Sequence, residues 1–356
     1  MRGEVVHFSL YDVGAELRLE KVQRMLGRAP APAPLTTESP TPAYVGFSQP
    51  LEVAWTPEGA STPGMRVEVR LHAVGVVAVR IRLPVTVAAM EELPGASKAA
   101  RIQGRTLEEA SAGWFRALEA ELKHAFVEPY QGLPQMETYR AFCLVEAPSA
   151  EDLLAHGRED LASLVAGEPR GVLVPDTVAG ALKHTIHYYR GHCAILGWDN
   201  ALVVSPTKDY EDLLDVFEVA NLELLEFRTY DAYLDRRLEQ SFAALDRLWA
   251  RGGIFRSARA PLKELSELRV DLARLTDNLH DTGKVFGDWY LAKVHQRLQE
   301  RFHIGSWEKA VENKMATMED MYQLAEEEAN HRRSLILEVM IVLLFILDVA
   351  LLFILK

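Results

Sequence analysis

The chain has 356 residues, of which 49% are apolar and 25% are charged, and its formal net charge is −12. The apolar content is that of a folded protein, and the length allows two folded units and a membrane segment. The acidic balance argues against a nucleic-acid partner. The two cysteines, Cys143 and Cys193, form no CxxC pair, so we expect neither a disulfide framework nor a zinc site.

Residues 1–205 predict an α+β domain. Apolar residues recur in short segments, some with the two-residue period of a strand and others with the period of a helix. These segments do not follow a regular βαβ order, which favours an antiparallel sheet. The expected elements, in chain order, are a half-buried strand at 4–11, a helix at 15–26, paired strands at 66–72 and 76–83, a helix at 106–126 opened by a capping box, a strand at 138–146, helices within 150–166 and 176–186, and a hairpin of strands 193–196 and 201–204.

The paired strands at 66–72 and 76–83 have one apolar face and one face rich in arginine. The arginines are Arg66, Arg70, Arg80 and Arg82. We interpret this face as the solvated side of the sheet, with an anion-binding surface as the alternative. Before these strands, residues 27–50 contain the run APAPAP and predict a loop or semi-rigid spacer, with a proline-rich ligand for a partner domain as the alternative.

Residues 206–333 predict long helices that pack as an antiparallel bundle or coiled coil. Apolar residues recur at helical spacing over 209–249, over 261–302 with interruptions at Gly283 and Gly287, and from Ser306 onward. Because no proline or glycine follows Ser306, one helix of about fifty residues should run to the end of the chain.

Acidic and basic residues stand inside the apolar stripe of the first long helix: Glu223, Glu226, Arg228, Asp231 and Asp235. We expect them to form ion pairs between helices that set the register of the bundle. Pairs within the helix, a solvated face or a partner contact are the alternatives.

Residues 334–355 predict one transmembrane helix, because every residue except Ser334, Glu338 and Asp348 is apolar. The apolar residues contribute roughly −5 to −10 kcal/mol to insertion, and a near-central Asp348 opposes this by roughly 2.5 to 3.5 kcal/mol. A buried helix of a soluble protein is the alternative. An acid in the membrane needs a proton or a partner helix, so Asp348 predicts a homo-oligomer or a contact with another membrane protein.

The flanking sequence predicts a single-pass protein whose N-terminal bulk lies in the cytoplasm. His331, Arg332 and Arg333 precede the apolar segment, and positive flanks stay on the cytoplasmic side. The N-terminus has no continuous apolar stretch of the kind found in a secretory signal.

Four segments carry a resemblance to a known family: HYYRGHCAILGWDNALVV (187–204), FEVANLELLEFRTYDAYLDRRLE (217–239), residues 275–315, and HRRSLILEVMIVLLFILDVALL (331–352). Over roughly 140–356 the chain resembles the "required for meiotic nuclear division" or Sad1-interacting-factor-like family. That resemblance implies a membrane-associated protein without an assigned enzymatic activity. Eukaryotic relatives support organelle functions, including mitochondrial translation, but the basic targeting extension of the mitochondrial members is absent here.

Two clusters of polar residues are candidates for metal binding or acid–base chemistry. Asp277, His280 and Asp281 lie at i, i+3 and i+4 of a predicted helix, and His184 and His187 share a face of another. Ordinary polar residues at a helix end explain the first cluster as well, and the second has no adjacent acid. The HExxH, GxSxG, GxxxxGK[ST] and GxGxxG motifs do not occur, so we predict no cofactor.

These observations lead to two hypotheses for function. The first is a membrane-tethered, non-enzymatic scaffold or assembly factor that acts through protein–protein contacts. The second is a membrane-bound enzyme or ligand sensor that uses a pocket of the α+β domain or the helix face of Asp277, His280 and Asp281.

Overall fold

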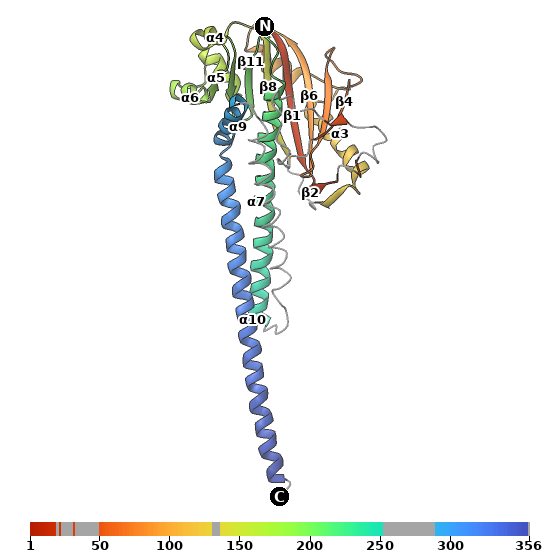
Figure 1. The fold of residues 1–356 in the computed structure, drawn as a ribbon, viewed down its shortest axis with the longest axis vertical. Helices are drawn as coiled ribbons and strands as arrows, with labels where there is room; N and C mark the ends of the chain where they lie inside the picture. Colours follow the sequence, from red (N-terminus) through yellow and green to blue (C-terminus); the bar gives the residue numbers. More distant parts are fainter. Residues whose placement is uncertain (19–20, 23–30, 33–49, 130–135, 252–288, 355–356) are drawn as a thin grey trace. The chain divides into compact units, whose positions relative to one another are not determined.

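The computed structural model describes residues 1–18, 21–22, 31–32, 50–129, 136–251 and 289–354 (Figure 1). These residues fall into two compact units. The first contains the described residues of Met1–Thr229 and Leu275–Ser306, and the second those of Tyr230–Arg274 and Trp307–Lys356. The division lies inside a long helix, whereas the sequence places the end of the first domain at residue 205.

The first unit is built on a mixed β-sheet with the strand order β3-β4-β5-β6-β1-β8-β11-β10-β9. Strand β1 (Arg2–Asp12) lies between β6 (Val76–Thr86) and β8 (Met136–Glu146) and is antiparallel to both. Strand β8 pairs in parallel with β11 (Asn200–Val204). The prediction of a purely antiparallel sheet is therefore wrong. Parallel neighbours need a long crossover, and the helices between β8 and β11 provide it.

The hairpins expected from the sequence are present. Strand β5 (Arg66–Leu71) pairs with β6 across a turn that contains Gly75 at φ 89°, a left-handed conformation that glycine adopts readily. Strand β10 (Cys193–Leu196) pairs with β11. Both hairpin predictions are confirmed, and β4 (Leu51–Trp55) and the two-residue β9 (Thr185–Ile186) extend the sheet on either side.

Two predictions near the N-terminus are wrong in part. Residues 15–17 of the helix expected at 15–26 belong instead to strand β2 (Gly14–Leu17), which pairs with β7 (Phe126–Pro129) outside the main sheet. Lys21 and Val22 are helical, and residues 19–20 and 23–26 lie outside the described residues. Within the proline-rich segment, β3 (Ala31–Pro32) pairs with β4 as the last strand of the sheet. Proline is tolerated on an edge strand because its missing N–H is not needed there. The rest of 27–50, apart from Pro50, lies outside the described residues.

One face of the sheet packs on a layer of short helices. They are α2 (Glu92–Ala99), α3 (Leu107–Leu122), α4 (Ala150–His156), α5 (Arg158–Ala166) and α6 (Pro175–Ala181). Alternate residues of the strands, such as Val69 and Ile81, share a hydrophobic core with helix residues such as Phe115 and Leu161. The capping box predicted for α3 is confirmed, because the Thr106 side chain accepts from the Glu109 amide and Glu109 accepts from the Thr106 amide.

The opposite face of the sheet packs on the first half of α7 (Glu211–Arg251) and on α9 (Trp289–Arg301). Tyr139 of β8 contacts both Phe217 and Phe302, with ring centroids 5.8 and 5.9 Å away. Strand β1 is therefore buried on both faces, and the prediction that it is half-buried is wrong. On the side of the short helices, His7 bonds to Ser97, and burial together with the charge of Arg140 lowers the pKa of His7 to about 3.

The second unit contains the rest of α7 and most of α10 (Ile304–Ile354), a helix of 51 residues. The prediction of one long C-terminal helix is confirmed. It begins two residues earlier than expected, so Ser306 lies inside the helix and does not cap it. The helix predicted over 261–288 lies outside the described residues.

Candidate functional site

The part of the arginine-rich face of β5 and β6 that carries Arg70 and Arg80 is buried against α7, whereas Arg66 is exposed. The side chains of Arg70 and Arg80 are 10% and 1% exposed. Their charges are met by acids of α7, because the alternation that points valines to one core sends the arginines toward this helix. The interpretation of a solvated arginine face is therefore wrong for Arg70 and Arg80.

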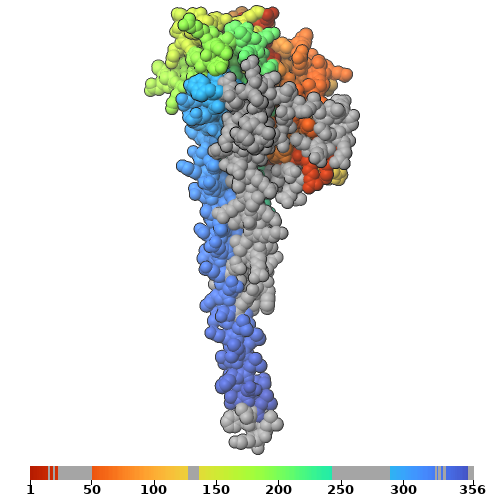
Figure 2. Space-filling model, viewed as in Figure 1, coloured from red at the N-terminus to blue at the C-terminus, as the bar shows by residue number. Residues whose placement is uncertain are grey.

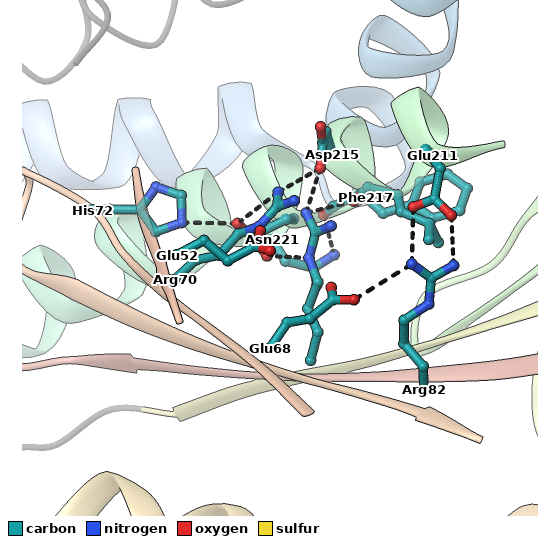
Figure 3. Close-up of polar contacts among 12 residues, drawn as sticks. Glu52, Glu68, Arg70, His72, Arg82, Glu211, Asp215, Phe217 and Asn221 are labelled. Carbon is teal, nitrogen blue, oxygen red and sulfur yellow. Dashed lines mark hydrogen bonds and ion pairs between the residues drawn. The ribbon is translucent and has the colours of Figure 1, made fainter. Parts of the chain in front are cut away.

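Two acids of α7, Asp215 and Glu218, accept most of these contacts. Figure 3 labels Asp215, Arg70, Glu52 and His72 of this group. Arg80 donates from Nε to Glu218 at 2.5 Å and from Nη2 to Asp215 at 2.7 Å. Arg70 donates to Asp215 at 2.5 Å and to Glu52 of β4 at 2.8 Å. We call this set, together with His72, the ionic layer.

The ionic layer sets the charge state of Glu218. Its side chain is 2% exposed, and His72 Nε2 lies 2.8 Å from Glu218 Oε1. Burial alone would raise the pKa of Glu218, but Arg80 and Arg70 outweigh it and hold this pKa well below the usual range. Glu218 is therefore ionised, and the layer is a set of satisfied charges rather than an open catalytic centre.

Arg82 extends the polar contacts toward the start of α7 (Figure 3). Its guanidinium lies 2.5 Å from Glu4 and 2.5 Å from Glu211, and Tyr210 donates to Glu4 at 2.8 Å. Ion pairs thus connect β1, β6 and α7. Each charged group has a partner of opposite sign, which offsets the cost of removing it from water.

The predicted acids of α7 point to different neighbours. Glu223 accepts from Gln299 of α9 at 3.1 and 3.2 Å, and His295 of the same helix lies 3.4 Å away. Arg228 donates to Glu137 of β8 at 2.6 Å. These residues therefore meet partners on α9 and on the sheet.

Glu226 instead interacts electrostatically with a second buried acid, Asp12, at the end of β1. The two residues are 2% and 0% exposed. Burial raises the pKa of Asp12 to about 7, and burial together with the charge of Asp12 raises the pKa of Glu226 well above its usual range. We call Asp12 and Glu226 the carboxyl pair. Nothing in the sequence brings them together, since β1 and α7 are far apart along the chain.

In the second unit, Asp231 and Asp235 of α7 meet Lys314 of α10. Lys314 Nζ lies 2.6 Å from a carboxylate oxygen of each. Burial would lower the pKa of Lys314, but the two carboxylates raise it. This is a contact between helices of the kind expected for the charged stripe.

The histidines singled out from the sequence do not form a shared helix face. Helix α6 ends at Ala181, so His184 lies in the turn that follows it, and His187 comes after β9. His187 Nδ1 lies 3.2 Å from the His192 carbonyl oxygen. In the described part of the chain, no group of three or more histidine, cysteine or acidic side chains is arranged to hold a metal. Asp277, His280 and Asp281 lie outside the described residues.

The C-terminal part of helix α10, drawn in dark blue in Figure 2, has an exposed apolar surface. Its segment Ser334–Leu351 has a mean hydropathy of 2.6, and none of it is buried. Glu338 and Asp348 stand on this segment and are exposed as well. It is the only helix in the described residues that is long and apolar enough to cross a membrane.

Sequence reasoning missed the ionic layer and the carboxyl pair. One signal was present: acids stand at 211, 215 and 218, which are neighbouring positions on one helix surface, opposite a strand face of arginines. Matching the two requires knowing that α7 covers that face, and the periodicity does not show this.

Comparison with known proteins corrects the family inferred from the sequence. A family model described as "Uncharacterized protein MJ0711, N-terminal domain" matches residues 2–211. The chain is also similar to the uncharacterized protein MJ0711 of Methanocaldococcus jannaschii, with 26% identity over 227 residues, or 64% of this chain and 69% of that protein. No solved structure matches the chain.

The match covers the sheet, the short helices and the start of α7, including the first 85 residues that the resemblance to the meiotic-nuclear-division family left out. That resemblance rested on the general order of long helices and a C-terminal apolar helix, and it is wrong as a family assignment. The chain belongs to the family defined by the N-terminal domain of MJ0711.

Proposed function

We propose that this protein is a membrane-tethered, non-enzymatic scaffold that forms homo-oligomers and acts through protein–protein contacts. The observation that carries the proposal is the apolar segment Ser334–Leu351, which ends a continuous 51-residue helix and is wholly exposed. An apolar surface of this length is expensive in water and matches the thickness of a bilayer. The basic residues before it favour a cytoplasmic location for the N-terminal bulk.

The ionic layer supports the scaffold role. Its arginines and acids bond to one another, and they fix the first half of α7 to the sheet. A rigid connection of this kind suits a protein that positions partners rather than one that binds a substrate at these charges.

Membrane attachment is tested by washing membranes that contain the full chain with alkaline carbonate. The full chain should stay in the pellet, and a variant that ends at residue 333 should move to the supernatant. Release of the full chain, or retention of the shortened chain, would contradict the proposal.

Oligomerisation is tested at Asp348. The described residues contain one helix that is long and apolar enough to span a membrane, so under this proposal a partner for an acid within the membrane comes from a second chain. Cross-linking in detergent should therefore show less oligomer for Asp348→Leu than for the natural chain, whereas Val349→Leu, a neighbouring apolar exchange, should have no effect. Equal cross-linking of Asp348→Leu and the natural chain would contradict the proposal that Asp348 stabilises the oligomer.

A second candidate, a membrane-bound ligand sensor, is favoured by a cavity of about 630 Å³ between α3 and the sheet. Its lining is mainly apolar and includes Trp55, Trp114 and Leu118. The full chain in lipid nanodiscs should then show saturable binding of the apolar probe N-phenyl-1-naphthylamine. Leu118→Glu should abolish this binding, and Leu324→Glu on the exposed surface of α10 should not. Absence of saturable binding would exclude this candidate.

A further inference from the structure

The carboxyl pair is unusual because its oxygens have almost no partners. Both carboxylate oxygens of Asp12 and the Oε1 atom of Glu226 are buried without a hydrogen bond to any described residue. The Thr229 hydroxyl and the Gly14 amide approach Asp12 and partly offset the effect of burial on its pKa. Neither contact has the geometry of a hydrogen bond.

No cation among the described residues neutralises the pair. The charged neighbours on α7 are already engaged: Arg228 with Glu137 of β8, and Glu218 with Arg80 and His72. On the strand beside Asp12, the residue opposite it is Val76 of β6. Two ionised carboxylates in such a place would repel each other and lose their hydration, and this cost is avoided only if something positive joins them.

The Thr229 side chain points to the same conclusion. It is 1% exposed, its hydroxyl has no hydrogen-bond partner among the described residues, and it approaches Asp12. A protonated carboxyl group can be buried without an uncompensated charge, so protonation accounts for acids whose oxygens have neither a hydrogen bond nor a cation. A proton satisfies this chemistry without the space that a hydrated ion requires.

We propose that Asp12 and Glu226 form a buried proton-binding site, which holds α7 against β1 while the proton is bound and loosens that contact when it leaves. Dissociation releases the proton to solvent and leaves two facing carboxylates. Thr229 is the last residue of α7 in the first unit. The site therefore acts on the last turn of α7 that belongs to the first unit.

The direction of the pH effect follows from linkage. The unfolded chain has ordinary acids that lose their protons near pH 4, whereas the folded pair keeps its protons to higher pH. At pH values between the pKa of the unfolded acids and the pKa of the folded pair, folding is therefore accompanied by proton uptake. Opening of the contact becomes more favourable as the pH rises, by about tenfold per pH unit for each proton.

Infrared spectroscopy tests whether the proton is there. The full chain in lipid nanodiscs at neutral pH should show the carbonyl stretch of a protonated carboxyl group, and this band should fade as the pH is raised. The variants Asp12→Asn and Glu226→Gln should each lose or shift the band. Glu223→Gln, another buried acid of α7 whose neighbours are polar, should keep it.

Hydrogen exchange tests the effect on α7. Amides of 222–229 should exchange faster, relative to the intrinsic rate, as the pH rises from about 6 to about 8 in the natural chain. Glu226→Gln mimics the protonated acid and should remove most of this pH dependence, whereas Glu223→Gln should retain it. The proposal is overturned if the band of a protonated carboxyl is missing, or if Glu226→Gln leaves the pH dependence unchanged.

A metal cation is the competing occupant. If Ca²⁺ or Mn²⁺ raises the melting temperature of the natural chain but not of Glu226→Gln, the site binds a metal and the assignment to a proton is wrong. No change with either ion, together with the infrared band, supports the proton.

Discussion

Arg80 and Glu218 are paired in a place from which water is excluded: Arg80 Nε lies 2.5 Å from Glu218 Oε2, and the side chains are 1% and 2% exposed. Removing one partner leaves the other charge buried and uncompensated. We therefore expect Arg80→Met or Glu218→Leu alone to lower the free energy of unfolding by about 3–5 kcal/mol. The double variant should lose clearly less than the sum, as measured by denaturant unfolding of the full chain in detergent.

An exposed pair provides the control for this cycle. Arg170 donates to Glu91, and the two side chains are 55% and 48% exposed. The Arg170 guanidinium also lies 2.9 Å from Asp160. Arg170→Ala should change the free energy of unfolding by no more than about 1 kcal/mol, because water screens an exposed pair. Strict additivity of the Arg80 and Glu218 substitutions would show that the buried pair is not coupled.

The low pKa of Glu218 predicts loss of stability in acid. Below the ordinary glutamate pKa of about 4.3, Glu218 is protonated in the unfolded chain but stays ionised in the folded protein. The free energy of unfolding should fall as the pH is lowered from about 5 to about 3, and Glu218→Gln should have a shallower slope. Melting temperatures across this range would measure it, and equal slopes for the two proteins would contradict the assignment.

Gly197, in the turn before β11, has no space for a side chain. A Cβ atom there would lie 2.5 Å from the Val165 carbonyl oxygen of α5 and 2.6 Å from the Asn200 carbonyl oxygen. Gly197→Ala should destabilise the protein by about 1–3 kcal/mol through overpacking.

Gly180 is the matched control because it lies in α6 with nothing within 4 Å of an added Cβ. Gly180→Ala should be neutral or stabilising by about 0.5–1 kcal/mol, since alanine favours the helix. Thermal unfolding compares the two variants directly. If the two variants had similar stability, the backbone around Gly197 would have shifted to accommodate the added Cβ without loss of stability.

Lys314 should set the register of the two helices in the second unit through Asp231 and Asp235. Lys314→Glu places three acids together and should speed hydrogen exchange in the second half of α7. Adding Asp231→Lys and Asp235→Lys to that variant should restore protection, because the charges are then exchanged. The effect should be on the order of 1 kcal/mol, since these side chains are partly exposed. Lys309→Glu, an exposed site on the same helix, should change little.

The sequence predicts the local elements well, because their signals are local. The capping box of α3, the β5–β6 hairpin at Gly75 and the length of α7 all follow from spacing within a few residues. The alternation of Arg80 with Val79 correctly separates two faces of a strand. It does not reveal that both faces are covered, since that depends on a helix more than a hundred residues later.

The carboxyl pair shows even more clearly that local sequence signals do not predict contacts between distant segments. Asp12 closes an ordinary strand, and Glu226 stands among several charges that have ordinary partners. Only the pairing of β1 with β6 and β8, and the position of α7 across them, brings the two acids together. The parallel pairing of β8 with β11 escaped prediction for a related reason, because a short strand does not encode the direction of its neighbour.

Strand β1 precedes both of its neighbours, β6 and β8, in the sequence, yet it lies between them in the middle of the sheet. Its two neighbours, β6 and β8, pair with it from residues 76–86 and 136–146. Contacts across such distances form late because the intervening chain must first be ordered. During synthesis, both backbone edges of β1 therefore stay unpaired until β6 and β8 have been synthesised. Strand β1 is thus a segment that needs protection from aggregation while the protein is being made.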